Sequence, residues 1–342
     1  MPDIVAGAVL QAIRSANAKH FSRWVLDPVD PLTVALRHRV QSSIQGTASK
    51  ADHPRDSQSM LAYSHPWNGG VVYTFHDTTY AYNPETNTWS SKSYSTSYAN
   101  TSASPYIDNC IYVMKKNFTA RYNVSSNSWT TMSYSYPPNG FGSGTSPSNG
   151  FIYCGTHYDT GTWYLDFHQY YPPTNTWTTK ASTLYYHWGP SSYAIGTSVS
   201  YAGGMLPDYS YGAYHERYNP STNSWTTLSS MPQGRRYHSG CVSYPFLRHI
   251  TFCGEISSST PYTSTILSYA TETNTWSTMS HTISPARNGC GSPRLTYNNT
   301  AYVTCGKISD SIYTKTTIAY TMDGAWFFNA LNAYLIAQTK GA

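Results

Sequence analysis

The stretch that decides the fold of this 342-residue chain reads YNPETNTW at residues 82–89. Variants of it follow as YNVSSNSW at 122–129, YPPTNTW at 171–177, YNPSTNSW at 218–225, ATETNTW at 270–276 and, in degenerate form, YTMDGAW at 320–326. The tryptophans of successive copies are 40, 48, 48, 51 and 50 residues apart. Six copies at this period indicate a chain built from repeated supersecondary units.

Each copy has the composition of a tight turn between two strands. Pro and Asn favour turns, and Asn tolerates the left-handed backbone conformation. The alternation of Thr88-Trp89-Ser90 is typical of a strand. We therefore expect the tyrosine to end one strand and the tryptophan to begin the next, with the tryptophans mostly buried. The residues with this structural role are Tyr82, Trp89, Tyr122, Trp129, Tyr170, Trp177, Tyr218, Trp225, Tyr269, Trp276, Tyr320 and Trp326.

A second short apolar strand precedes each copy. These strands are predicted at Val71–Thr74, Ile111–Met114, Phe151–Gly155, Val199–Gly204, Ile250–Gly254 and Ala301–Gly306. A further strand begins upstream of them, as the matching stretches Tyr186-His187-Trp188-Gly189 and Tyr237-His238-Ser239-Gly240 indicate. The repeat therefore predicts six units of four antiparallel strands, which suits the blades of a propeller.

On these motifs the chain resembles the kelch repeat family over roughly residues 53–330. The family's Gly-Gly doublet is clean only at Gly203-Gly204, and elsewhere it is Cys-Gly or missing. The resemblance implies an all-β fold, a six-bladed kelch-type β-propeller closed on itself. Two segments are alternatives for the strand that completes the last blade. One is Trp326-Phe327-Phe328 near the C-terminus, and the other lies near Val34–Ile44 in the N-terminal part of the chain.

The two ends of the chain lie outside the repeats. Residues 1–52 form a short, partly helical N-terminal extension, and residues 331–342 form a C-terminal tail. An apolar stretch from Ile4 to Ile13 follows Asp3, a plausible helix cap, and approximates a helical stripe over residues 4–18. Asp3 before this stretch and Arg14 after it argue against a secretory signal. We expect the extension to dock the protein onto a virion or another protein assembly.

Composition excludes several classes of protein. Charged residues make up 11% of the chain and the net charge is +5, without any run of Lys or Arg, so nucleic-acid binding is not expected. No run of 18 apolar residues exists, so no membrane span is expected. The 33 tyrosines and abundant Ser, Thr and Asn indicate a neutral, hydroxyl-rich surface.

The six cysteines admit two interpretations. Cys154, Cys253 and Cys305 each precede a Gly at what looks like one repeat position, which suggests small buried packing residues. Alternatively, folding the hairpins places Cys241 opposite Cys253 and Cys290 opposite Cys305, within reach of disulfide bonds. No CxxC or HxxxH pairing exists, so neither a metal site nor any other cofactor is expected.

Aromatic loops define the predicted binding face. The loop after the second strand is longer in repeats three to six than in the first two, and its insertions are rich in Tyr and Ser. Rigid aromatics with a polar tip give large contact area at low entropy cost. We expect one asymmetric face to bind a glycan or a protein through Tyr158, Trp163, Tyr186, His187, Trp188, Tyr209, Tyr211, Arg235, Arg236, Tyr237, His238, Tyr262 and Arg287.

Low charge without an export signal fits a protein made in the host cytoplasm and released in a virion. We therefore expect a non-enzymatic structural or attachment protein, such as a phage fibre, spike or decoration, which could oligomerise. The alternative is a secreted or periplasmic carbohydrate-active or carbohydrate-binding kelch protein. Resemblance to sialic acid epimerases would pair Arg235, Arg236 or Arg287 with Glu216 or Glu255. Resemblance to galactose oxidase would imply copper, but its ligands cannot be matched, and we assign no catalytic residue.

Overall fold

The computed structural model describes residues 46–52, 54, 61–64, 72–75, 78–93, 105–115, 118–132, 143–145, 149–159, 161–243, 248–291 and 300–321. This part of the chain contains strands and no helix, which confirms the all-β prediction. The helix predicted over residues 4–18, the C-terminal tail and Trp326 lie outside the described residues.

Five antiparallel sheets of four strands, each in chain order, make up most of the described structure. Sheet 1 contains β2 (Leu61–Ser64), β3 (Val72–Phe75), β4 (Thr79–Asn83) and β5 (Thr88–Ser91). Sheet 2 contains β6 (Tyr106–Ile107), β7 (Cys110–Lys115), β8 (Phe118–Asn123) and β9 (Ser128–Met132). Sheet 3 contains β10 (Ser143–Thr145), β11 (Ile152–Asp159), β12 (Thr162–Tyr171) and β13 (Thr176–Lys180).

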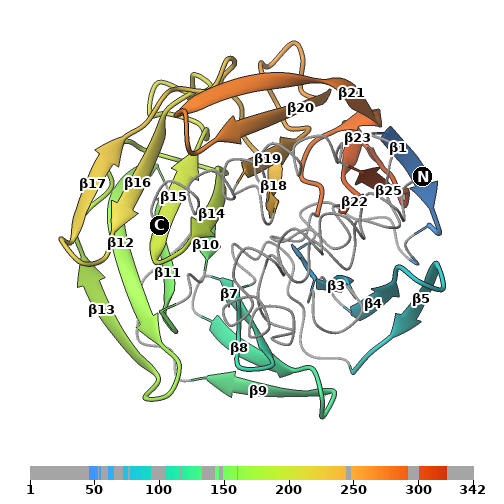
Figure 1. The fold of residues 1–342 in the computed structure, drawn as a ribbon, viewed down its shortest axis with the longest axis horizontal. Coiled ribbons are helices and arrows are strands. Elements are labelled where there is room, and N and C mark those ends of the chain that lie inside the picture. The colour runs from blue at the N-terminus through green and yellow to red at the C-terminus, as the bar shows by residue number, and fades with distance from the viewer. Residues whose placement is uncertain are drawn as a thin grey trace, which may run out of the picture.

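Sheet 4 contains β14 (Ser191–Ile195), β15 (Ser198–Ala202), β16 (His215–Asn219) and β17 (Ser224–Thr227). Sheet 5 contains β18 (Ser239–Ser243), β19 (Arg248–Phe252), β20 (Thr263–Ala270) and β21 (Thr275–Arg287). Sheet 6 has three described strands, β22 (Thr300–Thr304), β25 (Thr317–Thr321) and β1 (Gly46–Lys50), and a small hairpin of β23 (Lys307–Ser309) and β24 (Ile312–Tyr313) follows β22. The sheets follow one another in chain order around a common centre, so that sheet 6 lies next to sheet 1 (Figure 1).

The sixth sheet joins the two ends of the described chain. β1 pairs antiparallel with β25, from Gly46 opposite Thr321 to Lys50 opposite Thr317. Of the two segments predicted to complete the last sheet, the N-terminal one is therefore nearer to the observed arrangement. The observed strand is Gly46–Lys50, just after the predicted Val34–Ile44. Among the described residues the first strand is Gly46–Lys50, so part of the segment 1–52 that was predicted to be an extension belongs to a sheet.

The repeated phrase forms the outer turn of each sheet from 1 to 5. Its asparagine adopts a left-handed conformation with φ between 50° and 54°, which few residues other than Gly tolerate as well. The buried tyrosine hydroxyl donates to this asparagine's Oδ1 at 2.8 to 2.9 Å in all five copies. The pairs are Tyr82 and Asn87, Tyr122 and Asn127, Tyr170 and Asn175, Tyr218 and Asn223, and Tyr269 and Asn274.

The same turn also holds the preceding sheet. In sheet 4, Trp225 Nε1 donates to the carbonyl of Ala181, and Asn223 Oδ1 accepts from the amide of Ala181. In equivalent turns, the backbone amide of Ala51, Ser93 or Ser229 donates to the asparagine, and the carbonyl of the same residue accepts from the tryptophan. The tyrosines of the repeat are fully buried, but the five described tryptophans are only partly buried, because each indole covers a joint between two sheets. The prediction of mostly buried tryptophans is therefore too strong.

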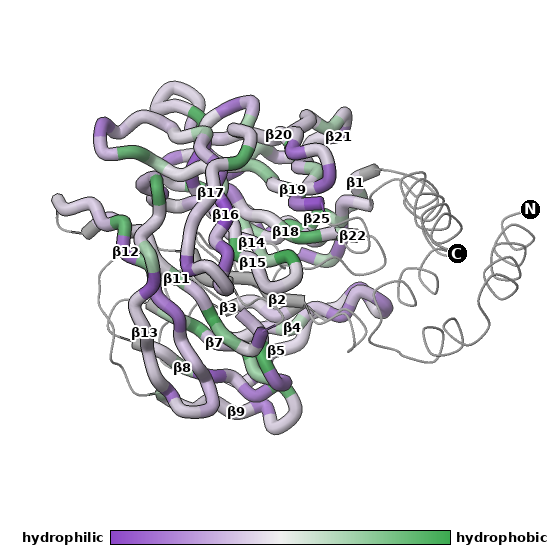
Figure 2. The backbone as a smooth tube through the Cα atoms, turned by 60° about the vertical axis from the view of Figure 1, so that its left-hand side comes forward, coloured by the Kyte–Doolittle hydropathy of each residue, from purple (hydrophilic) through white to green (hydrophobic). Residues whose placement is uncertain are grey.

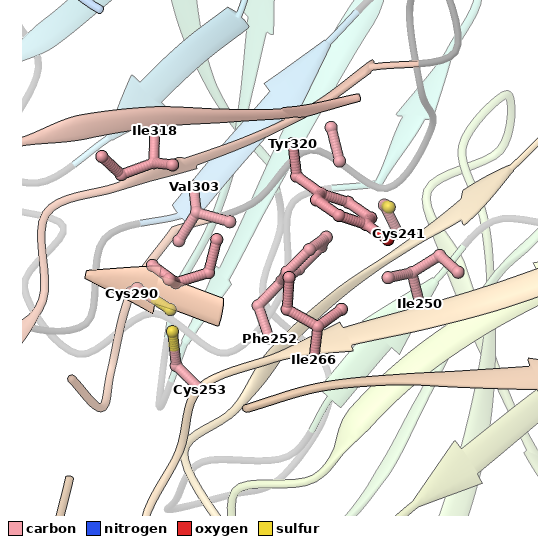
Figure 3. Close-up of a cluster of buried hydrophobic side chains, with 11 residues drawn as sticks. Cys241, Ile250, Phe252, Cys253, Ile266, Cys290, Val303, Ile318 and Tyr320 are labelled. Carbon is pink, nitrogen blue, oxygen red and sulfur yellow. The ribbon is translucent and has the colours of Figure 1, made fainter. Parts of the chain in front are cut away.

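Apolar side chains pack between neighbouring sheets. Figure 2 shows hydrophobic stretches within the strands of the ring, interrupted by hydrophilic residues. Between sheets 5 and 6, Ile250, Phe252 and Ile266 meet Val303, Ile318 and Tyr320 (Figure 3). Similar clusters join sheets 1 and 2, and sheets 3 and 4. Each joint between sheets therefore contributes its own small core.

All six cysteines are free thiols, which favours the packing interpretation. The predicted pair of Cys241 and Cys253 is wrong, because the register of β18 and β19 places Cys241 opposite Ile250. Two bridges, Asn288 to Lys307 and Gly291 to Thr304, do put Cys290 opposite Cys305, yet no bond joins them. The Cys290 sulfur instead faces that of Cys253 from the neighbouring sheet (Figure 3).

The predicted equivalence of Cys154 with Cys253 and Cys305 is wrong, as the left-handed residue near the end of each sheet's second strand shows. Gly203, Cys253 and Cys305 share this conformation, with φ of 72°, 62° and 57°. In sheet 3 the corresponding left-handed residue is Thr156, with φ of 51°, whereas Cys154 lies within β11. Cys154 is therefore not equivalent to the other two cysteines.

Candidate functional site

The segments that join one sheet to the next form three equivalent bridges. Trp188 pairs with Met205 in sheet 4, Arg236 pairs with Glu255 in sheet 5, and Asn288 pairs with Lys307 beside β22 of sheet 6. Each bridge follows the left-handed residue and glycine that end the second strand of its sheet. The same backbone geometry thus carries the ring of Trp188 in sheet 4, the Arg236–Glu255 ion pair in sheet 5 and the amide of Asn288 beside sheet 6.

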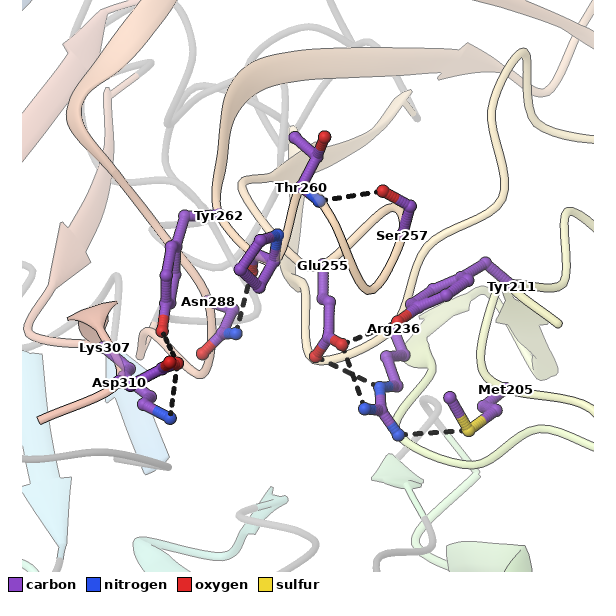
Figure 4. A network of polar contacts seen from close by, with 11 residues as sticks. Met205, Tyr211, Arg236, Glu255, Ser257, Thr260, Tyr262, Asn288, Lys307 and Asp310 are labelled. Atoms are coloured by element: carbon purple, nitrogen blue, oxygen red, sulfur yellow. Dashed lines mark hydrogen bonds and ion pairs between the residues drawn. The ribbon is translucent and has the colours of Figure 1, made fainter. Parts of the chain in front are cut away.

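The middle bridge carries the ion pair. Arg236 Nε donates to Glu255 Oε2 at 3.2 Å, and Arg236 Nη2 donates to Glu255 Oε1 at 3.0 Å (Figure 4). Tyr211 from sheet 4 donates its hydroxyl to Glu255 Oε1 at 2.7 Å. Arg236 Nη1 meets the sulfur of Met205 at 3.0 Å. The side chains of Arg236 and Glu255 are 16% and 11% exposed, so the pair is held firmly but still reaches the surface.

Three aromatic rings surround the guanidinium. Its central carbon lies 4.7 Å from the ring centre of Tyr237, 5.0 Å from that of Trp188 and 5.7 Å from that of Tyr211. These distances permit cation–π attraction, which is strongest where water is excluded. Gly189 allows this packing, because a Cβ at that position would lie 2.7 Å from the Tyr237 ring.

Trp188 connects the ion pair to a second group of rings, which we call the outer aromatic cluster: Tyr158, Trp163, Tyr186, Trp188 and Tyr209. The ring centres of Tyr158 and Trp188 are 5.0 Å apart, and those of Tyr158 and Trp163 are 4.9 Å apart. Trp163 also contacts Tyr186 and Tyr209, at 6.0 and 6.1 Å. The cluster combines the β11–β12 hairpin of sheet 3 with loops of sheet 4, so it spans two sheets.

Two tyrosines of the site adopt strained backbone conformations. Tyr209 has φ of 60° and Tyr237 has φ of 53°, a region that bulky residues rarely occupy. Tyr209 is 57% exposed. Its hydroxyl lies 3.4 Å from that of Tyr158. Such outliers cluster at functional sites, where the strain holds a side chain in a particular place.

Three tyrosine hydroxyls at the site, those of Tyr158, Tyr211 and Tyr237, remain protonated at neutral pH. Burial, followed by the hydrogen bond to Glu255, raises the pKa of Tyr211 to about 12. Burial also raises the pKa of Tyr237 to about 12. The hydrogen bond with Tyr209 raises the pKa of Tyr158. These groups can therefore both donate and accept hydrogen bonds to a ligand.

A smaller polar group lies beside the ion pair, toward sheet 6 (Figure 4). Tyr262 donates its hydroxyl to Asp310 Oδ1 at 3.1 Å, and Lys307 Nζ lies 3.7 Å from the same oxygen. Asn288 donates its side-chain amide to the carbonyl of Pro261 at 2.9 Å. These contacts keep the loops of sheets 5 and 6 together.

The structure divides the predicted binding residues into two groups. It brings Tyr158, Trp163, Tyr186, Trp188, Tyr209, Tyr211, Arg236 and Tyr237 into one continuous cluster, with Tyr262 nearby (Figure 4). In contrast, His187, Arg235, His238 and Arg287 are buried, with at most 5% of each residue exposed.

Those four residues support the loops from inside. Arg235 Nη1 donates to the carbonyl of Cys253, and Arg287 Nη1 donates to that of Cys305 in the equivalent place. His187 Nε2 lies 3.1 Å from Glu216 Oε1, and both side chains are completely buried. Of the arginine–glutamate combinations considered from the sequence, Arg236 with Glu255 is therefore the one that forms an ion pair.

Sequence reasoning missed Met205, Asn288, Lys307 and Asp310 as members of the site. Met205 and Lys307 could have been found, since each follows the small residue and glycine that end the second strand, as Glu255 does. Within the described residues, no group of three or more His, Cys, Asp or Glu side chains is placed to hold a metal ion. The same part of the chain contains no helix suited to crossing a membrane.

No protein-family model matches the chain, and no curated protein matches it. By contrast, 923 chains of solved structures match its fold. One of them, described as "Structure of YjhT", superposes with a TM-score of 0.65 at 15% sequence identity, covering 80% of this chain and 97% of that chain. At this low identity the likeness concerns the fold alone.

Proposed function

We propose that the protein is a six-bladed propeller of the kelch type that binds a carbohydrate at the outer aromatic cluster and the adjacent Arg236–Glu255 pair. Three observations support the propeller: sheets that follow one another around a centre, a sixth sheet that joins both ends of the described chain, and a turn repeated in sheets 1 to 5. In such a ring each sheet would be one blade, and the blades would keep only short, protected sheet edges.

The continuous cluster of rings and hydrogen-bonding groups carries the assignment to carbohydrate. One face of a pyranose ring presents weakly positive C–H groups, which pack well on the negative face of an aromatic ring. Tyr209, which is 57% exposed, offers such a face, and the partly buried Trp163 lies beside it. Beside them, Glu255, Arg236 and the tyrosine hydroxyls offer acceptors and donors for sugar hydroxyls.

The biological role that we propose is attachment of a virion to a host-surface glycan. Low charge and abundant Tyr, Ser and Thr support an exposed particle protein, and the N-terminal segment would dock it onto the particle. Since β1 belongs to sheet 6, the docking part would lie before residue 46. A secreted or periplasmic location is the alternative.

A carbohydrate-active enzyme is the second candidate, and the Arg236–Glu255 pair favours it. A carboxylate and a guanidinium next to a bound sugar can serve acid–base chemistry. The galactose oxidase-like alternative stays a prediction from the sequence, since its copper ligands could not be matched to residues of this chain.

A glycan array tests the proposed function. The wild-type protein should bind a defined set of glycans, and the variants Trp163→Ala and Tyr209→Ala should lose most of that binding. Tyr171→Ala is the matched control, because Tyr171 is 38% exposed but lies at the opposite end of β12 from Trp163. Equal loss in all three variants, or no glycan bound by the wild type, would refute carbohydrate binding at this cluster.

A further inference from the structure

The Arg236–Glu255 pair bears on whether the site can bind a charged ligand. Two of the three guanidinium nitrogens face the Glu255 carboxylate in a side-on arrangement. Such a fork is the geometry in which Arg would otherwise hold a ligand carboxylate or sulfate. The position that an anionic ligand would need is thus already taken by the protein's own carboxylate.

The third nitrogen is only weakly engaged. Arg236 Nη1 points at the Met205 sulfur, and a thioether is a weak acceptor. A hydroxyl oxygen of a ligand is a better acceptor than this thioether. Glu255 Oε1 accepts from both Arg236 and Tyr211, whereas Oε2 accepts from Arg236 alone and can still accept from a ligand hydroxyl.

Three further cations near the site, Lys307, Arg235 and Arg287, are neutralised or buried. Lys307 lies 3.7 Å from the carboxylate of Asp310. Arg235 and Arg287 are buried and donate to backbone carbonyls. Over the described residues of this face, each of these cations has its own partner. An anionic ligand would therefore lose its hydration and meet Glu255 without gaining a new counter-charge.

We infer that the site selects neutral glycans and disfavours their carboxylated or sulfated forms, with Arg236 and Glu255 as the residues that set this preference. Nη1 of Arg236 donates to one ligand hydroxyl, and Oε2 of Glu255 accepts from another. The sugar ring stacks on the outer aromatic cluster. This inference rests on the proposed carbohydrate binding and specifies its ligand class.

The test compares matched probes on one array: N-acetyllactosamine and other neutral oligosaccharides, each beside its sialylated and sulfated form. We expect the neutral form to bind at least about tenfold more tightly, a difference of about 1.4 kcal/mol. The Glu255→Gln variant should reduce or reverse this preference, because it frees the Arg236 guanidinium to pair with an anion. Glu272→Gln is the matched control, since it removes the same charge from an exposed ion pair with Arg248.

The outcomes separate the two proposals. If acidic forms bind as tightly as neutral forms or more tightly, the inference fails while carbohydrate binding stands. If no glycan of either kind binds, both fail. Equal behaviour of the Glu255→Gln and Glu272→Gln variants would also overturn the role of the pair.

A second measurement keeps the inference testable if Glu255→Gln does not fold. The affinity of wild-type protein for the neutral probe should stay constant from about 50 mM to about 500 mM sodium chloride, because no charge pairing with the ligand is available to be screened. A marked loss of affinity with salt would show that the ligand is held by charge, and would overturn the inference.

Discussion

At the outer turns of sheets 1 to 5, tyrosine, asparagine and tryptophan recur with nearly constant hydrogen-bond lengths. At the joining loops of the same molecule, the equivalent positions hold Trp188, Arg236 and Asn288, which share a backbone bridge but no side-chain chemistry. Copies that stay alike hold neighbouring sheets together. Copies that keep the backbone geometry but differ in their side chains make one part of the surface chemically different from the rest. In a chain built from repeats, such a difference indicates where a ligand would bind.

The largest expected effect lies at the outer turns. Tyr218→Ala removes a fully buried ring from the joint between sheets 3 and 4 and should cost about 3–5 kcal/mol of unfolding free energy. Glycan affinity of the folded fraction should not change, since the rings that Tyr218 contacts do not belong to the outer aromatic cluster. Chemical denaturation with binding measured in parallel checks both expectations. A loss of affinity without a loss of stability would break the distinction between the two regions.

The asparagine of the turn should have the next largest effect. Asn223→Ala leaves the Tyr218 hydroxyl and the Ala181 amide without their acceptor, at a cost of about 1–3 kcal/mol. Asn223→Gly loses the same acceptor but relieves the left-handed backbone, so it should be less destabilising than Asn223→Ala by about 1 kcal/mol. Equal free energies of unfolding for the two variants would show that backbone conformation plays no part.

Acid should weaken the joint between sheets 4 and 5. Burial lowers the pKa of His215 to about 3, since the side chain contacts Tyr269 and Trp276 of the next sheet. Because the folded pKa lies below the unfolded value of about 6.5, the stabilisation is complete above pH 6.5 and is lost as pH falls toward 3. The slope should approach about 1.4 kcal/mol per pH unit.

Unfolding measured from pH 7 to pH 4 tests this expectation, with His215→Gln as the comparison. That variant should be less stable at neutral pH, because it loses the contact with Tyr193, but its stability should fall less steeply with acid. Parallel pH profiles for the two proteins would exclude His215 as the cause.

The smallest stability change should come from the binding face, with the opposite sign. Tyr209→Gly relieves the left-handed strain of an exposed residue and should raise stability by about 1 kcal/mol or less, while it removes a ring that we propose stacks on the ligand. Thermal unfolding and glycan titration of the variant check the two parts. A destabilised variant with full affinity would reverse the interpretation of this region.

The repeat was readable from the sequence because its turn and its Tyr–Asn hydrogen bond lie within eight consecutive residues. Its Tyr and Asn are five residues apart, and the turn between them needs particular residue types. The closing strand was harder to locate. Gly46–Lys50 reads GTASK, which has little β-propensity of its own, and its place in sheet 6 depends on pairing with β25, more than 260 residues away.

The site was readable only in part. The tyrosine-rich loops supplied eight residues that the structure brings into one cluster. However, Arg235 and Arg236 are neighbours in sequence, and only the fold turns one inward and the other toward Glu255. Tyr209 and Tyr237 occupy left-handed positions that composition would assign to Gly or Asn. The grouping of Trp188, Met205 and Glu255 depends on the joints between sheets, which no local pattern encodes.

The most direct test of the central claim is a crystal structure of the protein with the neutral oligosaccharide that binds most tightly on the array. The account predicts a sugar ring stacked on Trp163 or Tyr209, with hydroxyls within hydrogen-bond distance of Glu255 Oε2 and Arg236 Nη1. A glycan bound instead at the repeated outer turns, or at the Tyr171 end of β12, would contradict it.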